Sequence, residues 1–253
     1  AVQQEQHSVR LLPTRSGLRL TKEHAEHVER SHISRLLRDH KLSLILDLDH
    51  TLVHTTADRR AHEIYNRSCA LERNDLHLLH FGGQNNYMKL RPGAFKFVAE
   101  AAKLFELHIY TGGDKNYALA VAEVLDPQGH LFSERVVSYQ DFDDKDRFAK
   151  HVDRLFPVDD STVLILDDLP EVWGWSPKVL RVEQYHFWKF WLDVSAAQAA
   201  PRLDHVPVPK EGDYGRAEGE AAAKRARVTQ GSALADALFD QDKDEVLMHR
   251  LDI

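Results

Sequence analysis

The sequence contains a single cysteine, Cys69, among its 253 residues, so no disulfide bond can form within the chain. This scarcity is typical of proteins that work in a reducing compartment. No apolar run approaches the roughly 20 residues that a membrane-spanning helix needs, and the first residues do not form a signal peptide. We therefore expect an intracellular, soluble protein that does not enter a membrane.

A basic excess is also missing. The chain has 33 Lys and Arg against 40 Asp and Glu, and its formal net charge is −7. Proteins usually bind nucleic acid through clustered Lys and Arg side chains that neutralise phosphates. The acidic balance disfavours tight, direct binding of nucleic acid, and we expect no such partner.

Hydrophobic residues make up 43% of the chain, which suffices for the core of one sizeable domain with extensions. Residues 1–40 are predicted to form an N-terminal extension with an amphipathic helix over Thr21–His40 and Thr21 as its N-cap. Residues 41–195 form the main domain in this interpretation. From 196 to 253 the composition shifts to Ala, Gly, Pro and charged residues, which predicts a linker or a partly disordered tail.

Apolar runs and helical segments alternate along the main domain. The runs that predict buried strands are Leu42–Leu48, Leu107–Tyr110, Arg135–Tyr139 and Thr162–Leu166, with Val179–Val182 as a shorter candidate. The segments that predict helices are Pro92–Leu104, Lys115–Leu125 and the shorter Arg147–Phe156. This alternation indicates an α/β fold with a doubly wound, mainly parallel sheet.

Residues 54–90 interrupt the alternation. They contain two runs of alternating apolar residues, Leu76–Phe81 and Tyr87–Leu90, around the turn sequence "GGQNN". We expect a small β-hairpin insertion here. Neither this insertion nor the segment after Asp126 is long enough for a large cap domain, so we expect an open cleft.

Carboxylates follow two of the predicted strands. Asp47 and Asp49 come directly after the first, and Asp167 and Asp168 follow the fourth. Ligands of open parallel sheets bind beyond the carboxyl ends of the strands, so these side chains are expected to converge. Four carboxylates in one place need a cation, and Mg²⁺ prefers such oxygen ligands. A turn after a strand, or a solvated helix cap, is the alternative for each pair taken alone.

Phosphate-binding groups are expected at the same edge. Thr111 and Gly112 follow the second strand and precede a helix, where hydroxyl and N–H groups bind phosphate oxygens. Lys150 would supply further positive charge, with Lys145 as a nearby competitor.

The sequence resembles a known family over roughly residues 17–191. Asp47-Leu48-Asp49-His50-Thr51 matches the Asp-x-Asp-x-Thr motif of the haloacid dehalogenase superfamily of phosphotransferases. Six stretches narrow the resemblance to the catalytic domain of the RNA polymerase II carboxy-terminal-domain phosphatases. They are "LDLDHTLVH", "KLRPG" (89–93), "IYTGGDKNYA" (109–118), "LDP" (125–127), "LFPVDDSTVLILDD" (155–168) and "EVWGWSPKVLRV" (171–182).

The resemblance implies roles for the motif residues. Asp47 would be the nucleophile that forms an aspartyl-phosphate. Asp49 would act as general acid and then general base, and would bind Mg²⁺ through its backbone carbonyl. Thr51 would steady the loop.

The remaining roles concern charge. Thr111 and Lys150 would hold phosphate oxygens, and Asp168, supported by Asp167, would bind the metal. The chain departs from the family pattern at Leu169, where Arg is common, and at Tyr139, within "SYQDFD" where many members have Ser-Arg-Asp-Glu. Both departures are expected to affect peptide recognition.

The resemblance thus implies a magnesium-dependent phosphoserine/phosphothreonine protein phosphatase. Its substrate would be the phosphorylated, Ser-Pro-rich heptad repeats of RNA polymerase II. The protein would be located in the nucleus, and the transcription machinery would supply further partners. Two alternatives stay open: a phosphatase for a small phosphorylated metabolite, and an inactive scaffold that binds phosphopeptides.

One aromatic cluster also allows two interpretations. Its members are Trp173, Trp175, Tyr185, Phe187, Trp188, Phe190 and Trp191. They could stack on a proline-rich peptide or pack against the edge of the domain. Arg91, before Pro92, either approaches the site or forms a structural ion pair.

Overall fold

The computed structural model describes residues 8–10, 19–142 and 149–188, and the predicted tail lies outside this range. Its centre is a five-stranded sheet with the order β10-β9-β3-β7-β8, in which all neighbouring strands are parallel. The strands are β3 (Leu42–Leu46), β7 (Phe105–Thr111), β8 (Val136–Ser138), β9 (Val163–Asp167) and β10 (Val179–Arg181). The predicted parallel sheet is confirmed.

Both faces of this sheet are buried, which explains the near-continuous apolar runs. On β3, Leu44 and Leu46 join the core cluster on one face and Ile45 joins the cluster on the other. Helices α3 (Ala94–Leu104) and α4 (Lys115–Leu125) supply the first cluster. The second cluster is completed by loop residues and by the 3₁₀-helix η3 (Pro170–Trp173).

Capping residues set the helix starts. Asp114 accepts the backbone N–H of Tyr117 at 2.8 Å and begins α4, whose bounds match the prediction. Thr21 accepts the N–H of His24 at 3.4 Å and begins α1 (Lys22–Arg38), as expected. Before α1, the short strands β1 (Ser8–Arg10) and β2 (Arg19–Thr21) pair antiparallel.

The helix predicted over Arg147–Phe156 is wrong for the described part of that range. Only the 3₁₀-helix η2 (Val152–Arg154) forms there, and Lys150 lies in a loop. The backbone N–H of Lys150 donates to the carbonyl of Val172 at 2.8 Å instead of to a residue in its own turn. A contact with a distant segment therefore replaces the local helical bond.

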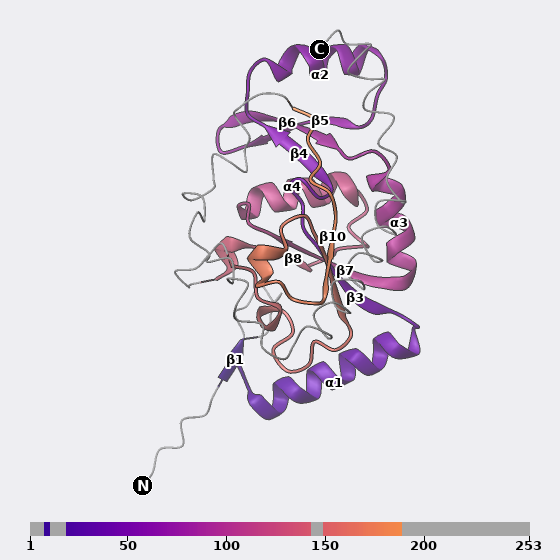
Figure 1. Cartoon of the computed structure of the whole chain (residues 1–253), viewed down its shortest axis with the longest axis vertical. Coiled ribbons are helices and arrows are strands. Elements are labelled where there is room, and N and C mark those ends of the chain that lie inside the picture. Colours follow the sequence, from indigo (N-terminus) through magenta and orange to yellow (C-terminus); the bar gives the residue numbers. More distant parts are fainter. Residues whose placement is uncertain (1–7, 11–18, 143–148, 189–253) are drawn as a thin grey trace, which may run out of the picture.

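The insertion is larger than a hairpin. The predicted strands form as β5 (Leu76–Phe81) and β6 (Gln84–Leu90), but β4 (Val53–Thr56) pairs on the other side of β6. Helix α2 (Ala61–Ala70) covers this small antiparallel sheet, and Figure 1 shows both beyond the end of the central sheet opposite α1.

The sequence did not predict α2 because its N-cap, Arg60, makes no side-chain capping bond. The helix also contains Asn, Ser, Cys and Tyr, which have modest helix propensity. Tertiary packing stabilises it, since Ala61 and Ile64 join a small apolar cluster with Leu76 and with Trp188.

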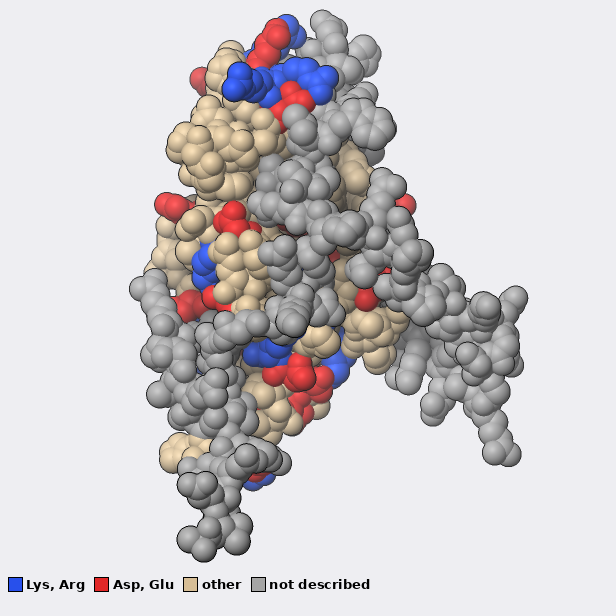
Figure 2. Space-filling model, turned by 90° about the vertical axis from the view of Figure 1, so that its left-hand side faces the viewer, with Lys and Arg blue, Asp and Glu red and all other residues tan. Residues whose placement is uncertain are grey.

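The described surface carries mixed charge. On the face shown in Figure 2, Lys and Arg side chains are interspersed with Asp and Glu. No helix within the described ranges has both the length and the apolar character to cross a membrane.

Candidate active site

Strand topology brings the predicted carboxylates together. In the central sheet, β7 and then β8 lie on one side of β3. On the other side of β3 lie β9 and then β10. The carboxyl ends of β3 and β9 therefore form a topological switch point, the usual ligand position in such sheets. Asp47 follows β3 directly and Asp167 is the last residue of β9.

A tight turn after β3 carries the first motif. Val53 donates its N–H to the carbonyl of Leu48 at 3.0 Å, and His50 has a positive φ of 61°. The hydroxyl of Thr51 donates to Asp168 Oδ1 at 2.9 Å and accepts the N–H of Asp168 at 3.1 Å. Thr51 thus ties the turn to the loop after β9.

Lys150 lies between two buried carboxylates. Its Nζ is 2.5 Å from Asp47 Oδ1 and 2.7 Å from Asp167 Oδ2. The indole N–H of Trp173 also donates to Asp167 Oδ2 at 2.7 Å. Since each carboxylate has a donor, the ionised forms are stabilised despite burial.

Burial and mutual repulsion perturb these groups. Burial raises the pKa of Asp47, and the charge of Lys150 opposes that shift. Burial also raises the pKa of Asp168, and the neighbouring Asp167 adds to it. Burial opposes the charge on Lys150, but Asp167 and Asp47 outweigh it and raise its pKa, so Lys150 stays a cation.

The oxygen donors suit a hard divalent cation. One carboxylate oxygen from each of Asp47, Asp167 and Asp168 lies within 4.8 Å of the others. All three side chains are buried, and oxygen ligands are those that Mg²⁺ prefers. The side chain of Asp49 is not part of this group, so its contribution through the backbone carbonyl stays a prediction.

Asp49 is held by a residue that sequence reasoning did not single out. The hydroxyl of Tyr117, on α4, donates to Asp49 Oδ1 at 2.6 Å. Burial and the charge of Asp49 raise the pKa of Tyr117 well above its ordinary value, so it remains a proton donor. The two residues are 68 positions apart, which left no local signal.

Thr111 and Gly112 lie at the same edge. Thr111 ends β7, the neighbour of β3, and its Oγ1 accepts the N–H of Gly113 at 3.0 Å. Gly112 is exposed and precedes the N-terminus of α4, where partial positive charge favours phosphate.

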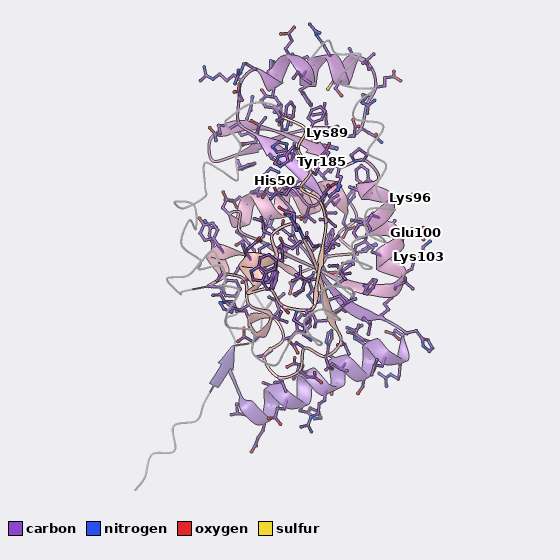
Figure 3. The ribbon with its side chains drawn as sticks, viewed as in Figure 1. His50, Lys89, Lys96, Glu100, Lys103 and Tyr185 are labelled. Atoms are coloured by element: carbon purple, nitrogen blue, oxygen red, sulfur yellow. The ribbon has the colours of Figure 1, made fainter. Side chains whose placement is uncertain are left out.

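The segment 183–188 closes one side of the site. Gln184 donates from Nε2 to Asp168 Oδ2 at 3.0 Å, and the N–H of Tyr185 donates to the carbonyl of His50 at 2.7 Å. Tyr185 lies beside His50 and beside Lys89 of β6, as Figure 3 shows. Sequence reasoning missed Gln184, because an exposed glutamine after a short strand has no distinguishing pattern.

Packing explains most of the aromatic cluster. Trp173, Tyr185, Phe187 and Trp188 are buried, whereas Trp175 is 60% exposed. Phe190 and Trp191 lie outside the described residues, as does Lys145. Arg91 is buried, and it donates to the backbone carbonyls of Thr51 at 3.2 Å and Glu183 at 2.9 Å.

The structure also gathers His50, His54 and His186, a group that the sequence did not indicate. Nδ1 of His54 accepts the backbone N–H groups of Phe187 at 2.8 Å and Trp188 at 3.1 Å. The neutral ring therefore carries its proton on Nε2 and has no lone pair left for a metal. We interpret this cluster as structural.

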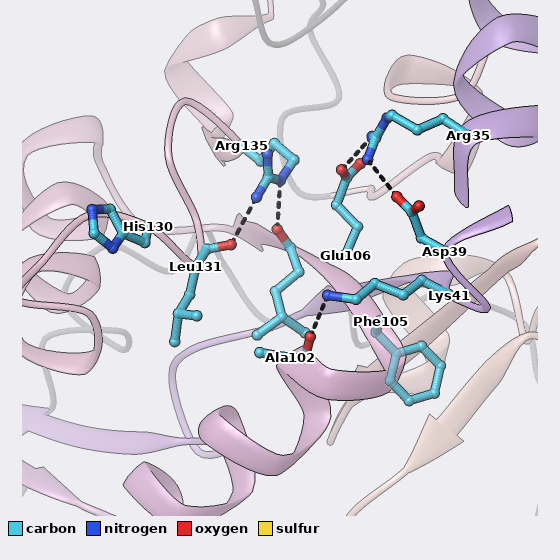
Figure 4. Close-up of a pocket in the computed structure, with 10 residues that line it drawn as sticks. Arg35, Asp39, Lys41, Ala102, Phe105, Glu106, His130, Leu131 and Arg135 are labelled. Carbon is cyan, nitrogen blue, oxygen red and sulfur yellow. Dashed lines mark hydrogen bonds and ion pairs between the residues drawn. The ribbon is translucent and has the colours of Figure 1, made fainter. Parts of the chain in front are cut away.

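A cavity of about 220 Å³ lies at the opposite end of the sheet. Figure 4 shows Lys41, which precedes β3, and Phe105, which begins β7, on the wall of this cavity with Arg35 and Glu106. Arg35 already contacts Glu106 at 2.6 Å, and Lys41 and Arg135 donate to backbone carbonyls. The cavity does not contribute to the carboxylate site.

Comparisons with known proteins agree on one family. The model of the NLI interacting factor-like phosphatase family matches residues 42–195. An RNA polymerase II C-terminal domain phosphatase of Schizosaccharomyces pombe is 38% identical over 180 residues, which cover 67% of this chain and 24% of that protein. "RNA polymerase II C-terminal domain phosphatase-like 4" of Arabidopsis thaliana is 33% identical, and the match covers 92% of this chain and 52% of that protein.

The chain is also similar to solved structures. The structure of Fcp1, described as an essential RNA polymerase II CTD phosphatase, aligns with a TM-score of 0.61 and 30% identity, covering 82% of this chain and 54% of that one. A fission yeast Fcp1 variant bound to beryllium fluoride aligns equally well. The chain spans 24% to 52% of the two curated relatives named above. With its haloacid dehalogenase-like sheet and its carboxylate site, the chain belongs to the NLI interacting factor-like phosphatase family.

Proposed function

We propose that this chain is the catalytic region of a magnesium-dependent phosphoserine/phosphothreonine protein phosphatase acting on the C-terminal heptad repeats of RNA polymerase II. The observation that carries the proposal is the buried group of Asp47, Asp167 and Asp168 with Lys150 between two of them. The names of the relatives support the substrate.

Asp47 attacks phosphorus with a carboxylate oxygen. The bond to the serine or threonine oxygen breaks, and Asp49 gives that oxygen a proton. Asp49 then takes a proton from the water that attacks the aspartyl-phosphate, which releases phosphate and regenerates Asp47. Burial raises the pKa of Asp47, and the contact with Lys150 opposes that rise and so favours the ionised form that the attack requires.

The other groups neutralise charge on the phosphate. Lys150, Thr111 and the N–H of Gly112 bind its oxygens, and Thr51 holds the turn against Asp168. Asp47, Asp167, Asp168 and the backbone carbonyl of Asp49 would hold Mg²⁺. The ion, when bound, polarises the phosphoryl group and offsets the charge that develops on it.

The proposal places the protein in the nucleus, with the transcription machinery as its surroundings. A small-molecule phosphatase would use the same residues, and only substrate preference separates the two. We expect a phosphoserine-proline peptide to be cleaved with a much higher kcat/KM than free phosphoserine, because flanking residues add binding energy. Equal efficiency would support the metabolite alternative.

The decisive experiment measures phosphate release from heptad peptides phosphorylated at single positions. Asp47→Asn is expected to lose activity by several orders of magnitude, because an amide does not attack phosphorus. Asp39→Asn, at the opposite end of the sheet, is the matched control and should retain activity. Chelation of divalent ions should abolish turnover, and beryllium fluoride should inhibit it. A fully active Asp47→Asn protein would exclude this mechanism, and a wild-type protein inactive on all phosphorylated substrates would support the scaffold.

A further inference from the structure

Tyr117 is fixed in place by several elements around the site. Its backbone N–H is bound by the capping side chain of Asp114, which sets the start of α4. Its side chain is 1% exposed, although its hydroxyl reaches the carboxyl group of Asp49. A buried phenol at this position can define where that carboxyl group lies.

The ring has room only because residue 113 is glycine. A Cβ at Gly113 would lie 2.5 Å from Cδ1 of the Tyr117 ring, well inside contact distance. From the insertion, Phe81 packs on the same ring with a centroid distance of 5.3 Å. Hence the ring is confined between the loop after β7 and the small sheet.

A chain of hydroxyl groups ends on Asp49. Tyr117 has one proton, and it gives that proton to Asp49 Oδ1, because a carboxyl oxygen that carries no proton only accepts. The hydroxyl of Thr55, 3.1 Å from the phenol oxygen, must then be the donor to Tyr117. Thr55 is buried in β4, so the insertion itself supports the chain.

We propose that Tyr117 is a positioning residue for Asp49: its hydroxyl holds Oδ1, so that Oδ2 carries the proton passed to the leaving oxygen. The inference rests on the proposed function, in which Asp49 is the general acid. As the bond from phosphorus to the serine oxygen breaks, the proton on Oδ2 moves to that oxygen. Without the Tyr117 hydroxyl the carboxyl group could rotate, and fewer bound substrates would meet a correctly placed proton.

The proposal is tested by changing how much the leaving group needs a proton. A phosphoserine peptide expels an alkoxide-like oxygen and needs the acid, whereas 2,4-dinitrophenyl phosphate expels a weak base and does not. Both kcat/KM values report steps up to the aspartyl-phosphate. Tyr117→Phe, which keeps the ring, is expected to lower kcat/KM about 10-fold to 100-fold for the peptide. The value for dinitrophenyl phosphate should stay within about twofold of wild type.

Control variants separate the possible failures. Tyr87→Phe removes another buried tyrosine hydroxyl, which lies 3.0 Å from Nδ1 of His62. This variant should change kcat/KM for neither substrate. Thr55→Val should also lower kcat/KM for the peptide and not for dinitrophenyl phosphate, but by a smaller factor of about threefold. Asp49→Asn should give the largest split.

The outcomes distinguish the inference from the proposed function. The positioning role is overturned if Tyr117→Phe lowers kcat/KM equally for both substrates, or does not lower it for the peptide. The acid role still stands in that case if Asp49→Asn lowers kcat/KM much more for the peptide than for dinitrophenyl phosphate. If Asp49→Asn itself shows no split, the acid role fails and the positioning role fails with it. Melting temperatures of all variants establish that each is folded.

Discussion

Lys150→Met is the substitution whose effect can be worked most directly from the structure. Met fills a similar volume but leaves Asp47 and Asp167 buried without the ammonium group that contacts both. Breaking a buried ion pair on one side costs about 3–5 kcal/mol of unfolding free energy. The loss of unfolding free energy cannot exceed the free energy needed to protonate one of the two carboxylates, because a neutral carboxyl group can stay buried. At pH 7, protonating a carboxylate with the ordinary Asp pKa of 3.8 costs about 4 kcal/mol.

The pH dependence gives the prediction its sign. The pKa of the remaining carboxylate pair rises in the variant, so the loss is largest at neutral pH and shrinks as pH falls towards the unfolded value. At pH 5 the proton costs about 2 kcal/mol, so the destabilisation should fall to roughly half. Denaturant unfolding of variant and wild type, at both pH values with chelator present, measures this difference.

Lys178→Met is the matched control for this measurement. Lys178 contacts Asp160 at 3.1 Å on the surface, where an ion pair contributes about 0–1 kcal/mol. The reasoning would be refuted if both variants lost the same small amount, or if the loss in Lys150→Met did not change with pH.

Further expectations concern the surroundings of the site and pH stability. Gln184→Ala removes the donor to Asp168 Oδ2 and should raise the Mg²⁺ concentration for half-maximal activity about threefold or more, measured by metal titration. Gly113→Ala forces a Cβ against Tyr117 and should lower both activity and unfolding free energy, the latter by about 1–3 kcal/mol. Burial lowers the pKa of His108, so the unfolded chain binds its proton first and stability should fall as pH drops below about 6.5. The slope contributed by this group is at most about 1.4 kcal/mol per pH unit, and His108→Phe should remove it.

Local patterns were sufficient for much of the fold. The bounds of β5 and α4 match their predictions, because alternation over six residues and helical spacing of apolar residues are signals carried by neighbouring residues. The order of apolar runs likewise predicted the parallel sheet, and with it the meeting of Asp47 and Asp167 at one edge. The carboxyl ends of parallel strands lie at one edge of a sheet, so residues that directly follow such strands are expected to be close in space.

The sequence by itself thus determined the sheet, its principal helices and the residue types gathered at one edge, since these follow from periodicity and caps. Tertiary structure alone decided that Lys150 sits in a loop between two carboxylates, that Tyr117 holds Asp49 and that Gln184 holds Asp168. It also decided that α2 forms at all. Each of these depends on groups that are distant along the chain and become neighbours only when the core is packed. No local pattern encodes such a contact, because its free energy exists only in the folded arrangement.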